Sequence, residues 1–160
     1  MPHPVIYRGD MAALVKEWQE KYRKAWSDRG EAGIRDLKIG NGECVRLPQE
    51  LTSVGHTSRW QPGDRVVDVA KTLQPGTVIA NFLFEYDKKW YPNSHGWHAA
   101  LFVRGEGYSV VTGAPSQIVM FDQWRGRAPN LRHVRNWPSE IEKTKEPSNI
   151  ADEFYVVVVP

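Results

Sequence analysis

The sequence predicts an α+β fold in which N-terminal helices, one of them carrying Cys44, pack on an antiparallel β-sheet. Two observations lead to this prediction. The helical patterns all fall before residue 52, and segments of strand character follow one another from about residue 65 to the C-terminus, joined by short turns. Runs of helix followed by runs of strand are typical of α+β domains. A chain of 160 residues suits one domain with a substantial core, so we expect residues 1–160 to form a single domain.

The first helix is predicted to begin after Asp10, whose side chain is a good N-cap, and to continue to about Ser27. Its apolar residues recur at spacings of three and four, so they share one face, which we expect to lie in the core. These residues are Met11, Leu14, Val15, Trp18, Tyr22 and Trp26. Residues 29–40 then read as a loop or broken helix containing three glycines.

The second helix is expected to be short and to run from near Cys44 through Leu51. Gly40, Asn41 and Gly42 allow a sharp turn just before it. Pro48 would disrupt a helix interior because it lacks an N–H group, but it is tolerated in a first turn. The position of Pro48 therefore places Cys44 close to the start of the helix.

Segments rich in β-branched and aromatic residues predict the strands. The uninterrupted apolar run of residues 154–159 is typical of a central strand. Residues 65–69 form a short strand or turn, and the polar residues between the strands read as loops. Residues 125–149, which are basic and then polar with three prolines, read as surface. The other predicted strands are residues 77–84, 98–103, 108–112 and 117–122.

Composition excludes several classes of protein. A content of 41% hydrophobic and 25% charged residues is ordinary for a globular domain. A net charge of +2 gives no case for nucleic-acid binding. The single cysteine forms no internal disulfide, and no run approaches the ~20 apolar residues of a membrane-spanning helix. The N-terminus lacks the pattern of a secretory signal. We therefore expect a soluble chain made in the cytoplasm, without membrane partners.

Cys44 is the candidate nucleophile, because a thiol at a helix start favours the reactive thiolate. A lone cysteine is also a common small buried residue, so the hypothesis needs a base and an orienting group. His98 stands at the start of a strand, where an imidazole is rigidly placed; the alternative is a structural histidine. Asp122 ends a later strand and could orient His98; the alternative is an aspartate that begins a turn.

Metal and cofactor sites are poorly supported by the sequence. There is no CxxC or HxxxH spacing, and only one cysteine is present. No glycine-rich phosphate loop precedes a helix. We expect chemistry that needs neither a metal ion nor another cofactor.

Helix-borne Cys, strand-borne His and a polar residue on a neighbouring strand follow one another as in the papain-like NlpC/P60 and CHAP amidases. More closely, the chain resembles the second family of type VI secretion amidase effectors. The similar pieces run in order from about residue 40 to 137. They are Glu43–Val45, Thr57–Trp60 with Gly63, Pro75–Phe82, Tyr91–Pro92, His98–Ala100, and Asp122–Trp124 with Gly126–Arg127.

This resemblance implies a papain-like NlpC/P60-type fold and a peptidoglycan endopeptidase that acts as an antibacterial toxin. The expected bond is the D-alanine–diaminopimelate crosslink of the stem peptides. The resemblance also implies delivery by the type VI secretion machinery, action in the periplasm of a target bacterium, and a cognate immunity protein that plugs the cleft.

The mechanism expected from this reading uses Cys44 as nucleophile, His98 as general base and acid, and Asp122 to orient His98. Trp60, Trp97 and Trp124 are candidates to line the substrate cleft, with ordinary packing as the alternative for each. Two other functions stay open at this point. One is a papain-like deamidase or acyltransferase acting on another acyl substrate, and the other is a non-catalytic wall-binding module with an inert thiol.

Overall fold

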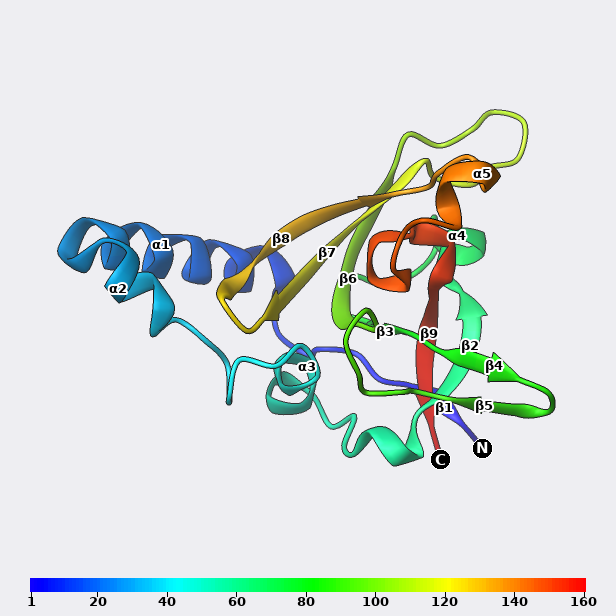
Figure 1. The fold of residues 1–160 in the computed structure, drawn as a ribbon, viewed down its shortest axis with the longest axis horizontal. Helices are drawn as coiled ribbons and strands as arrows, with labels where there is room; N and C mark the ends of the chain where they lie inside the picture. The colour runs from blue at the N-terminus through cyan, green and yellow to red at the C-terminus, as the bar shows by residue number, and fades with distance from the viewer.

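The computed structural model describes residues 1–160 (Figure 1). Nine strands and five helices are joined by short turns, three of which are single 3-10 turns. The strands are β1 (His3–Pro4), β2 (Gln61–Arg65), β3 (Val78–Asn81), β4 (Leu83–Glu85), β5 (Lys88–Trp90), β6 (Ala99–Glu106), β7 (Gln117–Trp124), β8 (Arg127–Arg135) and β9 (Phe154–Val159). The helices are α1 (Met11–Arg29), α2 (Glu31–Arg35), α3 (Arg46–Leu51), α4 (Val66–Val69) and α5 (Ser139–Glu142). The 3-10 turns are η1 (Thr57–Arg59), η2 (Pro147–Asn149) and η3 (Ala151–Glu153).

Seven strands form one sheet: six follow the order β1-β9-β3-β6-β7-β8, and β2 pairs with β9 on the side opposite β1. Every strand pair is antiparallel, which confirms the predicted α+β class. β9 pairs with β1, β2 and β3, as expected of a continuously apolar strand. The pairing of β1 with β9 also brings the two chain ends together, as Figure 1 shows.

Side chains that alternate along the strands supply a core on each face of the sheet. In β3, Val78 and Ala80 belong to the larger cluster together with Leu47 of α3, whereas Ile79 belongs to the other cluster. β6 alternates in the same way, because successive side chains of a strand point to opposite faces. The larger core therefore joins the sheet to the helices, including the one that follows Cys44.

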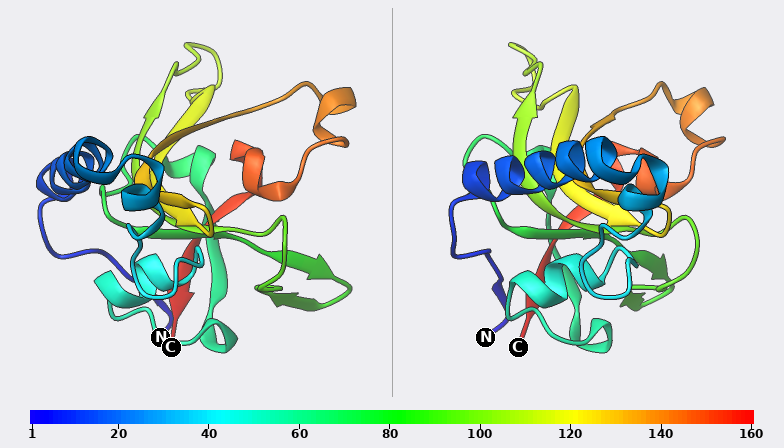
Figure 2. Two further views of the ribbon diagram at one scale, coloured as in Figure 1. Left: turned by 60° about the vertical axis from the view of Figure 1, so that its left-hand side comes forward. Right: turned by 90° about the vertical axis from the view of Figure 1, so that its left-hand side faces the viewer.

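α1 begins where the sequence predicts, with the Asp10 side chain accepting a hydrogen bond from the Ala13 N–H at 3.2 Å. Figure 2 shows it crossing one face of the sheet beside β7 and β8. Only its first half is buried, because the second half extends past the sheet. Tyr22 and Trp26 are 40% and 55% exposed, so the expectation that they lie in the core is wrong. α1 contains no run of residues long and apolar enough to cross a membrane, and neither does any shorter helix.

The predicted strand over residues 77–84 is in fact two strands in different sheets. β3 ends at Asn81, and β4 turns away to pair only with β5 in a protruding hairpin (Figure 1). The predicted loop after residue 86 therefore contains β5. Likewise, the first strand of this region lies earlier than expected, at β2, and residues 66–69 form the helical turn α4.

The predicted strand over residues 108–112 is a loop. Gly107 and Gly113 bracket it with φ of 66° and 75°, which turn the chain at both ends. The Ser109 hydroxyl accepts hydrogen bonds from the N–H groups of Val111 and Thr112, so the segment closes on itself rather than on a neighbouring strand.

β8 lies inside the stretch that was predicted to be plain surface. It pairs with β7 through seven residue pairs, and a tight turn at Gly126, whose φ is 94°, joins the two strands. β8 is the edge strand of the sheet, and charged and polar residues interrupt its apolar ones, although only His133 and Arg135 are exposed. That polarity hides its strand character in the sequence.

Candidate active site

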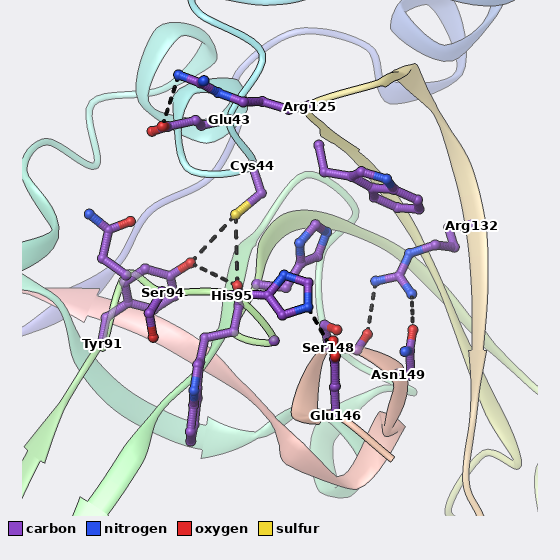
Figure 3. Close-up of a pocket in the computed structure, with 15 residues that line it drawn as sticks. Glu43, Cys44, Tyr91, Ser94, His95, Arg125, Arg132, Glu146, Ser148 and Asn149 are labelled. Carbon is purple, nitrogen blue, oxygen red and sulfur yellow. Dashed lines mark hydrogen bonds and ion pairs between the residues drawn. The ribbon is translucent and has the colours of Figure 1, made fainter.

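Cys44 lies in the turn just before α3, as predicted. Gly40 and Gly42 adopt φ of 60° and 89°, the left-handed region that favours glycine. Pro48 is the third residue of α3, so its missing N–H falls within the first turn. Val45 and Leu47 are buried in the larger core and anchor the turn. The thiol is thereby held at the edge of the core, where Figure 3 shows it facing a pocket.

The structure brings His98 and Asp122 together beneath this thiol. His98 comes directly before β6, and its Nε2 lies 2.7 Å from Oδ2 of Asp122 on the neighbouring β7. Both residues are buried, with Asp122 fully excluded from solvent. The contact with Asp122 occupies Nε2 and leaves Nδ1 as the ring nitrogen available to Cys44.

Two arginines of β8 complete the surroundings of Asp122. Arg127 Nη1 donates to Oδ1 at 2.7 Å, and Arg132 Nε donates to Oδ2 at 2.7 Å. A buried carboxylate is costly unless it is paired and hydrogen-bonded, and here both oxygens have cationic donors. Burial would raise the pKa of Asp122, but His98, Arg132 and Arg127 outweigh it and hold the pKa below its usual value.

The thiol and the imidazole shift each other's protonation. Burial opposes ionisation of Cys44, but the hydrogen bond and the charge of His98 outweigh it and lower the pKa of the thiol. Burial likewise opposes protonation of His98, but its hydrogen bonds with Asp122 and Cys44 raise the pKa of the imidazole. These opposite shifts favour transfer of the thiol proton to the imidazole, which gives a thiolate–imidazolium pair.

We therefore expect iodoacetamide to alkylate Cys44 rapidly at about pH 6 to 7, where an ordinary thiol of pKa ~8.5 reacts slowly. Replacing His98 with alanine should raise the midpoint of the rate–pH profile, because the thiol then loses the hydrogen bond and the charge that oppose the effect of its burial. The measurement is the alkylation rate by mass spectrometry across pH. A wild-type profile like that of free cysteine would contradict the ion pair.

Tyr91 touches the thiol from the other side. Its hydroxyl lies 3.5 Å from Cys44 Sγ and donates to the Trp97 carbonyl oxygen at 3.4 Å (Figure 3). Burial raises the pKa of Tyr91, so the phenol stays protonated and remains a hydrogen-bond donor. Its ring packs on Trp60, with the centroids 5.1 Å apart. A neutral donor is thus fixed beside the sulfur atom.

Gln123 holds the turn that carries Cys44. Its Oε1 accepts from the Ile39 N–H at 2.9 Å, and its Nε2 donates to the carbonyls of Ile39 and Glu43 at 2.8 and 3.0 Å. The side chain is fully buried. The β7–β8 register shifts between Asp122 and Trp124, which is a bulge at the site. One strand segment therefore positions both the imidazole, through Asp122, and the thiol turn, through Gln123.

Replacing Gln123 with leucine should lower the free energy of unfolding by about 1–3 kcal/mol, because it leaves the buried Ile39 N–H without a partner and removes the hydrogen bonds to the carbonyls of Ile39 and Glu43. The alkylation rate of Cys44 should fall as well, since the turn loses its anchor. Urea unfolding and the iodoacetamide rate measure the two effects. Gln117→Leu, at the partly exposed start of the same strand, is the matched control and should change neither. Equal effects of the two substitutions would contradict the anchoring role.

Asn81 fixes His98 through the backbone. Its Oδ1 accepts from the His98 N–H at 3.0 Å, and its Nδ2 donates to the carbonyls of Pro147 and Glu153. Arg132 reaches the same segment, because its Nη2 donates to the Ser148 carbonyl at 2.9 Å. Residues 146–149 are thereby held against the strands that carry His98 and Asp122.

The cleft over the thiol has a volume of about 530 Å³. Residues around Cys44, the loop of residues 91–98, the β7–β8 turn and residues 146–149 surround it (Figure 3). Trp97 and Trp124 line it, and the Trp124 ring stands edge-on to His98 with the centroids 6.0 Å apart. Trp60 does not line it. At 2% exposure it belongs to the core behind Tyr91, which corrects the expectation that it walls the cleft.

Polar side-chain contacts cross the rim of this cleft on two sides. His95 Nε2 lies 3.1 Å from Glu146 Oε1, and Arg125 lies 3.3 Å from Glu43. Both pairs are solvent-exposed, so each contributes little to stability. No group of three or more His, Cys, Asp or Glu residues is arranged to hold a metal ion. The cleft therefore offers a thiol, an imidazole and hydrogen-bond donors to a substrate.

A family model described as domesticated amidase effector 2 matches residues 35–157, which include Cys44, His98 and Asp122. The chain belongs to this family. Among solved structures, type 6 secretion amidase effector 2 (Tae2) is similar to it, with 28% sequence identity and a TM-score of 0.59 over 82% of this chain and 93% of that chain. No curated protein sequence matches significantly. The likeness confirms the papain-like NlpC/P60-type fold.

In this domesticated amidase effector 2 family member, sequence reasoning missed four residues that position the site. Gln123 could have been found from the sequence, because Asp122 and Gln123 are two consecutive polar residues at the end of an apolar strand. Asn81 could have been found in a similar way, as a polar residue within an apolar run. The sequence gives no indication of the roles of Arg127 and Arg132, because their approach to Asp122 depends on the pairing of β7 with β8.

Proposed function

We propose that the chain is a cysteine endopeptidase that hydrolyses the crosslinks of peptidoglycan stem peptides. The observation that carries this proposal is the line of Cys44, His98 and Asp122 at the floor of a cleft of about 530 Å³. Membership of an amidase effector family and the likeness to Tae2 support amide hydrolysis. The proposal treats residues 1–160 as one cysteine-amidase domain.

The reaction begins with the thiolate of Cys44, which attacks the carbonyl carbon of the scissile amide. A carbon–sulfur bond forms, and the carbonyl electrons move to the oxygen. When the carbon–nitrogen bond breaks, His98 gives its proton to the leaving amine. Water then attacks the thioester, with His98 accepting its proton, and releases a carboxylic acid and free Cys44. Asp122 keeps Nε2 of His98 engaged throughout, so Nδ1 faces the reacting atoms.

Two donors beside the thiol suit the tetrahedral oxyanion. The backbone N–H of Cys44 donates to no other protein group, and the Tyr91 hydroxyl lies 3.5 Å from the sulfur atom. Donors aimed at a developing oxyanion are typically worth about 3 kcal/mol each. Because Tyr91 stays protonated, its hydroxyl can turn from the sulfur or the Trp97 carbonyl to the oxyanion.

The proposed scissile bond joins D-alanine to diaminopimelate. The proposal extends to an antibacterial toxin that is delivered by type VI secretion, acts in the periplasm of a target bacterium and is countered by an immunity protein that covers the cleft. The likeness to Tae2, a type 6 secretion amidase effector, supports this setting. Trp97 and Trp124 are proposed to contact the substrate, since both line the cleft.

The test is digestion of diaminopimelate-type peptidoglycan with purified protein, followed by mass spectrometry of the fragments released by a muramidase. Loss of crosslinked dimers, with one water added for each bond cut, is the expected result. Sequencing the products by fragmentation then identifies the bond. Dimers left intact by a folded protein would overturn the proposal, and amine incorporation in place of water would reassign the chain as an acyltransferase.

A further inference from the structure

A second cavity of about 220 Å³ lies beside the catalytic cleft and shares Arg132 and Asn149 with it. It opens between the end of β8 and the segment that follows α5. Arg132 lines both cavities, and Figure 3 shows its guanidinium turned toward Ser148 and Asn149. A substrate lying in the cleft can therefore reach this cavity without leaving the protein surface.

Two cations and one aromatic ring form the far side of this cavity. The Arg135 guanidinium lies 4.6 Å and the Lys145 ammonium 4.3 Å from the centroid of Trp137. The indole is itself held in place, because its Nε1 donates to the Asn149 carbonyl at 2.9 Å. Cations that rest on an aromatic face keep their outward donors free. We call Arg135, Trp137 and Lys145 the Trp137 cluster.

The charges of the cluster are not neutralised within the protein. Neither Arg135 nor Lys145 forms an ion pair, whereas Arg132 at the boundary is paired with Asp122. No acidic residue lines the cavity. A pocket with unmatched cations on a rigid ring suits an oxyanion, which a guanidinium and an ammonium can bind together.

We propose that the Trp137 cluster binds a free carboxylate of the crosslinked peptide, several residues away from the scissile amide. This inference rests on the proposed function. A crosslinked dimer of diaminopimelate stem peptides carries several negative charges, because each diaminopimelate keeps one carboxylate that neither the peptide chain nor the crosslink uses. Adjacent residues of an extended peptide advance by roughly 3.3–3.6 Å, so a chain held at Cys44 can span the boundary at Arg132 within a few residues. The cluster thus selects acidic substrates and holds them in register.

The experiment compares two purified crosslinked muropeptide dimers, one with free carboxylates and one in which they are converted to amides. The enzymes are wild type, the double variant Arg135→Gln/Lys145→Gln, and the matched control Arg23→Gln/Lys24→Gln. The control removes the same charges from the exposed face of α1, away from both cavities. Steady-state kinetics give kcat and KM separately for each pair.

On the free-carboxylate dimer, we expect the KM of the double variant to be about 3- to 10-fold higher than that of wild type, with kcat unchanged. The effect is modest because the two lost charge contacts are exposed to solvent. The KM of wild type should be higher by a similar factor on the amidated dimer. On that dimer, the double variant should have the same KM as wild type. The control should match wild type. The inference would be overturned if the double variant raised KM equally on both dimers, or raised it on neither.

Calorimetric titration of each dimer into Cys44→Ala protein provides a readout that does not depend on turnover. We expect the Cys44→Ala protein to bind the amidated dimer more weakly than the free-carboxylate dimer. Adding Arg135→Gln/Lys145→Gln should remove this preference. If wild type cleaves neither dimer, the proposed function fails. If it cleaves both equally well, only this inference fails. Displacement of the acidic dimer by millimolar inorganic phosphate but not by acetate would reassign the cluster to phosphate groups.

Discussion

Replacing Cys44 with alanine should lower kcat/KM on crosslinked peptidoglycan by at least about 10⁴-fold, because no other group in the cleft can form the covalent intermediate. The thiol is the only sulfur nucleophile in the chain, and the cleft lies directly over it. Dimer consumption followed by mass spectrometry measures the loss.

Stability should change little in this variant, because the side chain loses a single atom at the edge of the core and alanine suits the turn. The thermal unfolding midpoint should therefore stay within a few degrees of wild type. Cys44→Ser is a further test, because it replaces the thiol with a hydroxyl. The pKa of that hydroxyl is too high for His98 to deprotonate it appreciably, so this variant should be nearly as inactive as Cys44→Ala. Retained hydrolysis by pure Cys44→Ala protein would rule out the thiol mechanism.

Replacing Asp122 with asparagine should reduce both activity and stability. The amide keeps the shape of the carboxylate but leaves two arginines and His98 without their buried negative partner. Breaking a buried ion pair from one side typically costs about 3–5 kcal/mol, which corresponds to a fall of roughly 10 °C in the unfolding midpoint. Because the imidazolium loses its orienting group, kcat should fall by up to about 10⁴-fold. Calorimetry and the dimer assay measure the two effects.

The pH dependence of stability separates this role from simple packing. The folded pKa of Asp122 lies below its unfolded value, so its contribution is present above about pH 4 and is lost as pH falls through the folded pKa. Wild-type stability should therefore fall more steeply in acid than that of Asp122→Asn. Asp68→Asn, which changes an exposed aspartate, is the matched control and should behave as wild type. Parallel acid unfolding of wild type and Asp122→Asn would contradict the charge-based account.

Most of the fold could be predicted where local pattern and burial agree. α1 begins at its predicted cap, and the central strand β9 has the uninterrupted apolar run expected of it. β8 could not be predicted, because charged and polar residues interrupt its apolar ones. The exposure of Trp26 was equally hidden, since an apolar helix face says nothing of how far the sheet beneath it extends.

The candidate site divides in the same way. Cys44, His98 and Asp122 could be selected from their residue types and their positions at element ends, and the structure brings all three together. Trp60 could not be distinguished from Trp97 or Trp124 in the sequence. Whether a tryptophan lies in the core behind Tyr91 or in the cleft depends on tertiary packing, which local sequence does not show. The arginines beside Asp122 depend on strand register, which local sequence does not specify.

By itself, the sequence determined the chemistry available to this protein: one thiol, a histidine at a strand start, a carboxylate at a strand end, and a family signature around them. These follow from residue identity and short-range spacing. Only the tertiary structure decided how that chemistry is tuned. The antiparallel pairing of β6, β7 and β8 buries His98 against Asp122 and places two arginines on the carboxylate. Such contacts join residues far apart in sequence, and their energies depend on burial and distance, which no local pattern encodes.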